Sequence, residues 1–288
     1  MAVCVRTDSA EFRAMLEERY VGFLTPVSRA TGAGTPAPRN LPQLEVELLP
    51  DAGGGDEDVS VRREAGRWVM TRGDFRAEWE PERRRGWVRQ TANPYAIDSV
   101  LRIVHTLLLA EEGGFLLHGA SAIRSGKALL FAGRSGAGKT TISRLAPEGV
   151  TLLTDEISYI RKTSVAGRGP STRDAKAPLA QDDRSEKLSR SNQYVAYGTP
   201  FAGELAKVGD NVSAPIEALY FLEKGPVNRI EALGVGEATR RLMQNILFFA
   251  EDEVLVERVF QAACEFTALV PAFRLEFVPD QRVWEMMG

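Results

Sequence analysis

Apolar residues in the first third of the chain repeat with two different periods. A helix is expected to begin within residues 8–11, where a capping side chain precedes an acid, and its apolar face would comprise Phe12, Met15, Leu16 and Phe23. Residues 44–48 alternate like a half-buried strand. Residues 59–63, 67–72 and 75–79 are short alternating runs separated by turn signals. The pattern predicts a helix followed by an antiparallel meander.

Three segments between these elements are predicted to be loops or turns. Residues 32–38 are rich in glycine and proline, residues 51–58 are acidic and glycine-rich, and residues 80–85 are charged. The last segment contains a cluster of three arginines, Arg83, Arg84 and Arg85. A solvated turn is the ordinary explanation of such a cluster, and a contact with an acidic partner is the alternative.

The pattern changes near residue 112. Residues 95–112 have apolar positions at helical spacing, and the pair Gly113-Gly114 is expected to end that helix. Short apolar runs at 115–117, 128–131 and 150–153 are typical of the core of a mixed sheet. Further strands are predicted at 194–197, 218–222, 229–233 and 273–277, and helices at 236–249 and 252–269. We therefore divide the chain into an N-terminal α+β region, residues 1–112, and a second region, residues 113–288.

Residues 161–190 interrupt the second region. They are polar, charged and rich in serine, glycine and proline, and they show little periodicity. Two interpretations stay open: an insertion loop without a role, or a mobile lid or substrate-binding loop beside an active site.

Composition narrows the class of protein. With 288 residues, 44% hydrophobic residues and a formal net charge of −3, the chain is expected to be a soluble globular protein without a nucleic-acid partner. Its two cysteines, Cys4 and Cys264, make neither a disulfide framework nor a zinc motif, so a cytoplasmic setting is expected. The sequence shows neither a signal peptide nor an apolar stretch long enough to cross a membrane.

The clearest chemical signal follows an apolar run at residues 128–132. Residues 133–140 read Gly-Arg-Ser-Gly-Ala-Gly-Lys-Thr, which fits the pattern G-x-x-x-x-G-K-[ST], and residues 141–145 can continue as a helix. Glycines let backbone N–H groups approach phosphate oxygens, and a following helix adds its positive end. A glycine-rich turn that binds nothing is the alternative, which the strand before the loop and the helix after it disfavour.

The motif assigns a role to each residue type. Lys139 would reach the β- and γ-phosphates of a nucleoside triphosphate, and the Thr140 hydroxyl would bind Mg²⁺. We therefore expect ATP and Mg²⁺ as cofactors. The predicted nucleotide-binding residues are Gly133, Ser135, Gly136, Ala137, Gly138, Lys139, Thr140 and Thr141.

Two acids follow the apolar run 150–153. The end of a central strand beside a phosphate loop is where nucleotide-dependent enzymes keep a metal-binding acid. Because adjacent side chains on an extended segment point to opposite faces, Asp155 and Glu156 are expected to differ in role. One would meet Mg²⁺ and the other would accept a proton or pack elsewhere. An acidic turn is the structural alternative.

The chain has two histidines. His105 lies in the middle of a predicted helix among apolar residues and is expected to be structural. His118 precedes Gly119 at the end of the run 115–117, and a parallel placement beside the strand before the phosphate loop would bring it to the site. There it would orient a neighbouring carboxylate or tune its charge. A hydrogen-bonded core histidine is the alternative.

Three motifs in this order resemble a known family: His118-Gly119, the phosphate loop ending in Lys139-Thr140, and Asp155-Glu156. Together they are similar to the catalytic domain of HPr kinase/phosphorylase and to smaller HPr-kinase-like proteins encoded near peptide-modifying enzymes. Residues 198–204 and 219–225 resemble segments of those smaller relatives, so the resemblance covers roughly residues 113–278. It implies an α/β fold whose mixed-sheet P-loop kinase core is of the HPr kinase and phosphoenolpyruvate carboxykinase type.

The resemblance also implies roles for residues. Asp155 would be the base that takes the proton from an acceptor serine, with help from His118, while Lys139 polarises the phosphates. Glu156, where the family usually has Asp, would join Thr140 on Mg²⁺. Arg240 and Arg241 are candidates for the family's substrate-binding arginine, because they lie near the end of the aligned region.

These observations lead to one expected activity and two rivals. The expected activity is that of an ATP- and Mg²⁺-dependent kinase acting on a hydroxyl, foremost a serine of a peptide or small protein. The rivals are phosphotransfer to a small metabolite, and a nucleotide-gated binding protein in which ATP orders residues 161–190. Larger relatives form rings, so a homo-oligomer stays open, as do the choice between ATP and GTP and a reverse phosphorylase reaction.

Overall fold

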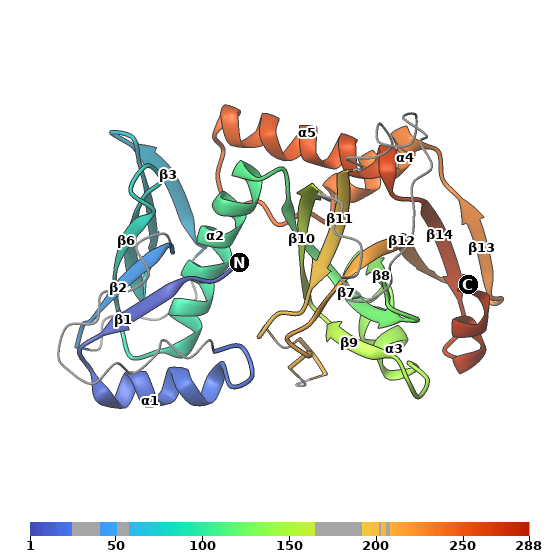
Figure 1. Cartoon of the computed structure of the whole chain (residues 1–288), viewed down its shortest axis with the longest axis horizontal. Helices are drawn as coiled ribbons and strands as arrows, with labels where there is room; N and C mark the ends of the chain where they lie inside the picture. The colour runs from blue at the N-terminus through green and yellow to red at the C-terminus, as the bar shows by residue number, and fades with distance from the viewer. Residues whose placement is uncertain (25–40, 51–57, 165–191, 202, 206–207, 288) are drawn as a thin grey trace, which may run out of the picture.

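The computed structural model describes residues 1–24, 41–50, 58–164, 192–201, 203–205 and 208–287. The predicted loop at 32–38, nearly all of 51–58 and most of 161–190 lie outside these ranges. Figure 1 shows two β-sheets side by side with a long helix, α2, between them. The elements are β1 (Cys4–Thr7), α1 (Ala10–Arg19), β2 (Gln43–Leu48), β3 (Ser60–Glu64), β4 (Arg67–Arg72), β5 (Phe75–Glu80), β6 (Arg85–Gln90), α2 (Pro94–Glu111), β7 (Phe115–Arg124), β8 (Lys127–Ala132), α3 (Lys139–Arg144), β9 (Thr151–Thr154), β10 (Ile157–Ser164), β11 (Asn192–Tyr197), β12 (Ser213–Lys224), β13 (Arg229–Ala232), α4 (Val235–Met243), α5 (Glu253–Leu269), β14 (Ala272–Phe277) and the 3-10 helix η1 (Gln281–Met286).

The first sheet has the strand order β1-β2-β6-β5-β4-β3. Strands β3 to β6 form an antiparallel meander, while β2 pairs in parallel with both β1 and β6. The predicted meander is confirmed, but it has one strand more than expected. Strand β6 begins at Arg85, which was predicted to belong to a turn. The sequence hides this strand because its buried face consists of Gly86, Val88 and Gln90, while Trp87 points outward.

Helix α1 starts as predicted. The Ser9 side chain accepts a hydrogen bond from the backbone N–H of Phe12 at 3.1 Å and caps the helix. Phe12 and Leu16 are buried, whereas Met15 is half-buried and Phe23 lies beyond the helix end. The apolar face is therefore shorter than predicted.

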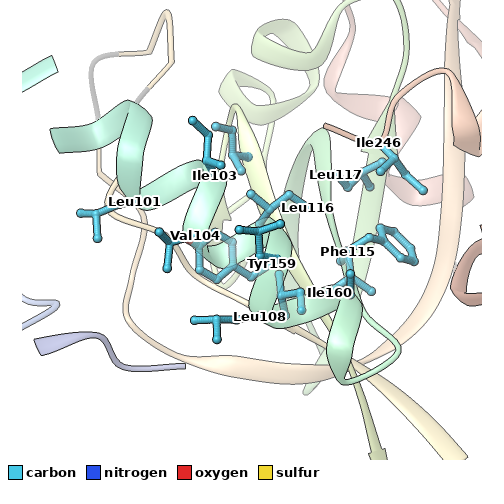
Figure 2. Close-up of a cluster of buried hydrophobic side chains, with 14 of the residues drawn as sticks. Leu101, Ile103, Val104, Leu108, Phe115, Leu116, Leu117, Tyr159, Ile160 and Ile246 are labelled. Atoms are coloured by element: carbon cyan, nitrogen blue, oxygen red, sulfur yellow. The ribbon is translucent and has the colours of Figure 1, made fainter. Parts of the chain in front are cut away.

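Helix α2 connects the two halves of the molecule. Asn93 caps it, and it ends before Gly113, whose φ of 72° breaks the helix as predicted. It contacts β5 and β6 of the first sheet and β7 of the second. Figure 2 shows its apolar side chains beside those of β7 and β10, among them Leu101, Ile103, Val104, Leu108, Phe115, Leu116, Leu117, Tyr159 and Ile160. One hydrophobic cluster therefore extends from the first sheet through α2 into the second.

The second sheet has eight strands in the order β11-β10-β7-β8-β12-β14-β13, with β9 paired to β7. Strands β8, β12 and β14 are parallel, and β7, β10 and β13 are antiparallel to their neighbours, so the predicted mixed sheet is confirmed. Several boundaries were wrong: β12, for example, begins at Ser213 instead of residue 218. Residues 161–164 continue β10 instead of starting a loop. Helix α4 ends at Met243 because Leu247 N–H donates to the Leu116 carbonyl, which draws the chain onto β7.

Two further expectations concern the whole chain. In the described ranges, no helix is long and apolar enough to cross a membrane. Cys4 and Cys264 are both unbonded and half-buried, so they form no disulfide with each other.

Candidate active site

The glycine-rich loop, residues 133–138, leaves the C-terminal end of β8 and leads into α3, so the predicted strand, loop and helix are all present. Gly136 and Gly138 have φ values of 76° and 110°, in the left-handed region that favours glycine. A Cβ added to Gly133 would lie 2.8 Å from the Cβ of Ala137. Side chains are therefore disfavoured by crowding at Gly133 and by the left-handed backbone at Gly136 and Gly138. Because α3 has only six residues, any phosphate contacts would come chiefly from the loop and from Lys139.

Lys139 begins α3, and its ammonium group turns back onto the loop. Its Nζ donates to the carbonyl oxygens of Gly133 at 2.9 Å and Arg134 at 3.4 Å. Burial lowers the pKa of Lys139, and the nearby carboxylates of Glu204 and Glu156 oppose this shift. An anionic phosphate oxygen would be a stronger partner for this ammonium than a neutral carbonyl.

Thr140 is paired with an acid that the sequence analysis did not select. Its Oγ1 donates to Glu204 Oε2 at 3.2 Å. Glu204 was noted only within a segment resembling the smaller relatives, and its spacing carries no local signal. Of the other predicted nucleotide-binding residues, Ser135 is exposed at the loop tip and Thr141 is half-buried in α3.

Asp155 and Glu156 form the bend between β9 and β10, which both pair antiparallel with β7. The Glu156 carbonyl accepts from Gly119 N–H at 2.9 Å, and the Thr154 hydroxyl accepts from Glu156 N–H at 3.2 Å. The bend is therefore fixed next to His118. The two carboxylates take different partners, as predicted from their adjacency.

The Asp155 carboxylate is buried and holds a distant segment of the chain. Its Oδ1 accepts from Gly203 N–H and its Oδ2 from Leu205 N–H, each at 2.9 Å. A Cβ on Gly203 would lie 2.9 Å from Asp155 Oδ2, so only glycine allows this approach. These bonds position Glu204, which lies between the two donors. Each carboxylate oxygen keeps a second lone pair for another hydrogen bond.

Glu156 faces helix α2. Its Oε2 lies 3.5 Å from the nearest guanidinium nitrogen of Arg102. Burial raises the pKa of Glu156, and the charge of Asp155 adds to the rise, while Arg102 and Lys139 oppose it. The ion pair with Arg102 is thus too long to offset the hydration that the Glu156 carboxylate loses on burial.

His118 reaches the site by a different route from the one predicted. Strand β7 is antiparallel to β8, not parallel. The reason is the tight turn at Ser125 and Gly126, with φ values of 52° and 78°, because two residues can join only antiparallel strands. His118 still lies beside the acids, since it pairs with Ile157 of β10.

The imidazole of His118 lies in a positive environment. Burial lowers its pKa, and the positive charges of Lys139 and Arg102 lower it further. Because the shift is downward from 6.5, His118 is neutral at pH 7 and one ring nitrogen can accept a proton. Among the described residues, its ring makes no hydrogen bond to Asp155.

Asn245 connects the phosphate loop to the strand of His118, and the sequence analysis missed it. Its Oδ1 accepts from Gly133 N–H at 3.1 Å, and its backbone carbonyl accepts from His118 N–H at 2.7 Å. Its Nδ2 donates to the Arg241 carbonyl at 2.8 Å. An asparagine inside a predicted helix, residues 236–249, gave no reason to select it.

The predicted candidates for a substrate arginine are engaged elsewhere. Arg240 pairs with Glu237 at 2.7 Å, and Arg241 pairs with Glu223 and Glu237, each at 2.7 Å. Neither side chain contacts Asp155, Glu156 or Lys139 in the described part of the chain. The arginine beside the acids is Arg102, which lies outside the region of family resemblance.

The structural expectation for His105 holds. His105 is buried in α2, where its Nδ1 lies 2.7 Å from the Leu101 carbonyl, and burial lowers its pKa to about 4. Of the predicted arginine turn, Arg83 pairs with Glu80, whereas Arg85 belongs to β6 and pairs with Glu45.

The donor set at the site fits a magnesium ion. Among the described residues, no three His, Cys, Asp or Glu side chains form a metal-binding group by themselves. Mg²⁺ commonly uses one or two carboxylates together with nucleotide phosphates and water. The pair of Thr140 and Glu204, with Glu156 as a further carboxylate near Lys139, satisfies that requirement.

Comparison with known proteins gives no family assignment. The sequence matches no model of a protein family, and a search of curated proteins finds no significant relative.

Proposed function

We propose that this chain is an ATP- and Mg²⁺-dependent kinase whose residues 113–288 form an HPr-kinase-like catalytic core. It transfers the γ-phosphoryl group of ATP to a hydroxyl, foremost a serine of a peptide or small protein. The observation that carries the proposal is the convergence of separate segments on one loop. Lys139 and Thr140 directly after the loop, the acids at 155 and 156, and Glu204 all take part in one network of contacts and charges.

The residues of the chain have distinct tasks in this reaction. The N–H groups of loop 133–138 and the ammonium of Lys139 bind the β- and γ-phosphates. Asp155 orients the acceptor hydroxyl and takes its proton, and neutral His118 supports the developing charge. The hydroxyl oxygen forms a bond to the γ-phosphorus while the bond between that phosphorus and the β–γ bridging oxygen breaks. ADP leaves with the electron pair of the broken bond.

Thr140 and Glu204, with Glu156 nearby, would hold the magnesium ion. When bound, Mg²⁺ supplies charge neutralisation for the phosphate oxygens. Positioning and electrostatics account for most of the acceleration in such reactions, so few covalent roles are needed from the protein.

The test is intact-mass spectrometry of serine-containing peptides encoded by neighbouring genes, incubated with the protein, ATP and Mg²⁺. A gain of about 80 daltons, one phosphoryl group, is expected. Lys139→Ala should abolish it, whereas Lys127→Ala, which removes an exposed lysine of β8 paired with Glu217, should not. Bound ATP without transfer to any peptide would favour the metabolite kinase or the nucleotide-gated binder instead.

A second variant tests the base. Asp155→Asn should abolish transfer and leave ATP affinity within about threefold, since the phosphates are held by the loop and Lys139. Because the Asn amide cannot accept both backbone hydrogen bonds, unfolding by urea is measured in parallel. An active Asp155→Asn enzyme would exclude Asp155 as the base.

A further inference from the structure

Arg102 is the least satisfied charged group at the site. A guanidinium has five N–H donors, yet in the described part of the chain this one makes a single hydrogen bond, 3.5 Å long, to Glu156. Its Nε is buried and has no hydrogen-bond partner among the described residues. The side chain is 28% exposed, so it is open to a ligand on one side.

The position of the guanidinium is nevertheless well determined. It lies over the ring of Phe201, with Cζ 4.8 Å from the ring centroid, and Phe201 is itself buried. Stacking holds the plane of an arginine while leaving the N–H groups at its edge available for an oxyanion. Arg102 is carried by α2, whose next turn is fixed to it by the Thr106 hydroxyl donating to the Arg102 carbonyl at 3.0 Å.

Arg102 and Lys139 act on the same two groups. Both positive charges influence the imidazole of His118 and the carboxylate of Glu156. Lys139 acts on these groups from the start of α3, and Arg102 acts on them from α2 and contacts Glu156. Positive charges from both regions of the chain therefore act on the acids.

We propose that Arg102 binds the transferring phosphoryl group, so that helix α2 of the N-terminal region completes the active site. The inference rests on the proposed kinase function. A planar donor fork with unused N–H groups fits phosphate oxygens, and a permanent positive charge there stabilises the transition state. The structural alternative is that Arg102 only holds Glu156 in place.

The test measures ligand affinity as well as turnover. The probes are Mg·ADP alone and Mg·ADP with aluminium fluoride, which mimics the phosphoryl group in transfer, titrated calorimetrically. Wild-type protein should bind ADP more tightly when aluminium fluoride is present. In Arg102→Gln, the increase in ADP affinity caused by aluminium fluoride should be at least about tenfold smaller. The affinity for ADP alone should stay within about threefold of the wild-type value, and transfer should be about a thousandfold slower.

Two variants serve as controls. Arg19→Gln removes a matched arginine, which is 29% exposed, pairs with Asp98 on α2 and stacks over Tyr95 at 4.8 Å, and it should keep the full gain. Arg102→Lys keeps the charge without the fork and should recover part of the gain, which a folding defect would not explain.

The outcomes separate the two hypotheses. If wild-type protein gains nothing from aluminium fluoride, the kinase proposal fails and the role of Arg102 fails with it. If wild-type protein gains affinity and Arg102→Gln keeps that gain, Arg102 alone is excluded. Adding Arg102→Gln to the Glu156→Gln variant should also remove the increase in ADP affinity caused by aluminium fluoride. If the double variant bound like Glu156→Gln alone, Arg102 would act only through Glu156.

Discussion

The first sheet and the candidate site differ in how their charged residues are paired. In the first sheet, arginines and acids form short pairs within the protein, such as Arg72 with Asp74 at 2.6 Å and Arg67 with Glu78 at 2.9 Å. At the phosphate loop, Lys139 has only carbonyl partners in the described structure, and Arg102 lies 3.5 Å from its acid. The comparison singles out Lys139 and Arg102 as candidate ligand-binding groups, because neither has an acidic partner closer than 3.5 Å among the described residues.

The first region and loop 133–138 also differ in backbone strain. In the first region, Ala65 and Arg84 adopt positive φ values of 46° and 50°, so these turns accept side chains. In the phosphate loop, Gly138 has φ of 110°, and a Cβ there would lie 2.7 Å from Phe277 Cζ. The loop therefore tolerates no side chain at this position without strain.

The largest effect on stability is expected for Gly138→Ala. Left-handed strain and the clash with Phe277 should together lower the free energy of unfolding by about 2–4 kcal/mol. Gly136→Ala is the control, because its φ is 76° but nothing lies within 4 Å of the added Cβ, and it should cost about 1–2 kcal/mol. Urea unfolding measures both. Equal losses of unfolding free energy in the two variants would show that the clash with Phe277 contributes little.

The next effect concerns Glu204. Glu204→Gln keeps the shape of the side chain but removes its charge, so the Mg²⁺ concentration that half-saturates ATP binding should rise about tenfold. Glu217→Gln removes an acid whose partner is the surface residue Lys127, at 3.3 Å, and should change nothing. Titration of Mg²⁺ at fixed ATP measures the difference. An unchanged midpoint for Glu204→Gln would assign the metal role to Glu156.

Two glutamates, Glu156 at the candidate site and Glu78 in the first sheet, should change the stability with opposite signs when each is replaced by glutamine. Burial raises the pKa of Glu156, so its ionisation above pH 4.5 weakens the fold, and Glu156→Gln should stabilise the protein at pH 7 by less than about 1 kcal/mol. The hydrogen bond from Arg67 lowers the pKa of Glu78, so its contribution is present above pH 4.5 and is lost as the pH falls. Glu78→Gln should therefore destabilise the protein at pH 7.

The two side chains are 31% and 28% exposed, which makes them a matched pair. Urea unfolding at pH 7 and pH 4 measures both signs, and both differences should shrink at the lower pH. The same sign for both variants at pH 7 would remove the contrast between the two regions.

The smallest effect is expected for Arg89→Gln. Arg89 and Glu47 are 65% and 61% exposed, and the solvent screens their pairing at 2.8 Å. The free energy of unfolding should change by less than about 0.5 kcal/mol, and ATP affinity should not change. A loss above 1 kcal/mol would show that the surface pairs of the first sheet form a cooperative network.

Local patterns were sufficient for much of the architecture. The capping serine of α1, the apolar spacing of α2 and the alternation of β3 to β5 are visible in the sequence because each depends on neighbouring residues. Strand β6 was not predicted, since glycine and glutamine occupy two of the three positions on its buried face. The antiparallel course of β7 was also missed, although the turn at Ser125 and Gly126 encodes it.

The sequence alone was sufficient to predict the chemistry of loop 133–138, because its glycines and the lysine and threonine after it lie close together in the chain and their spacing is the motif. Only the tertiary structure decided which residues surround it. Thr140 and Glu204 are 64 residues apart, Arg102 and Glu156 are 54 apart, and Gly133 and Asn245 are 112 apart. Such contacts depend on how strands and helices pack over long chain distances, and no local period records them.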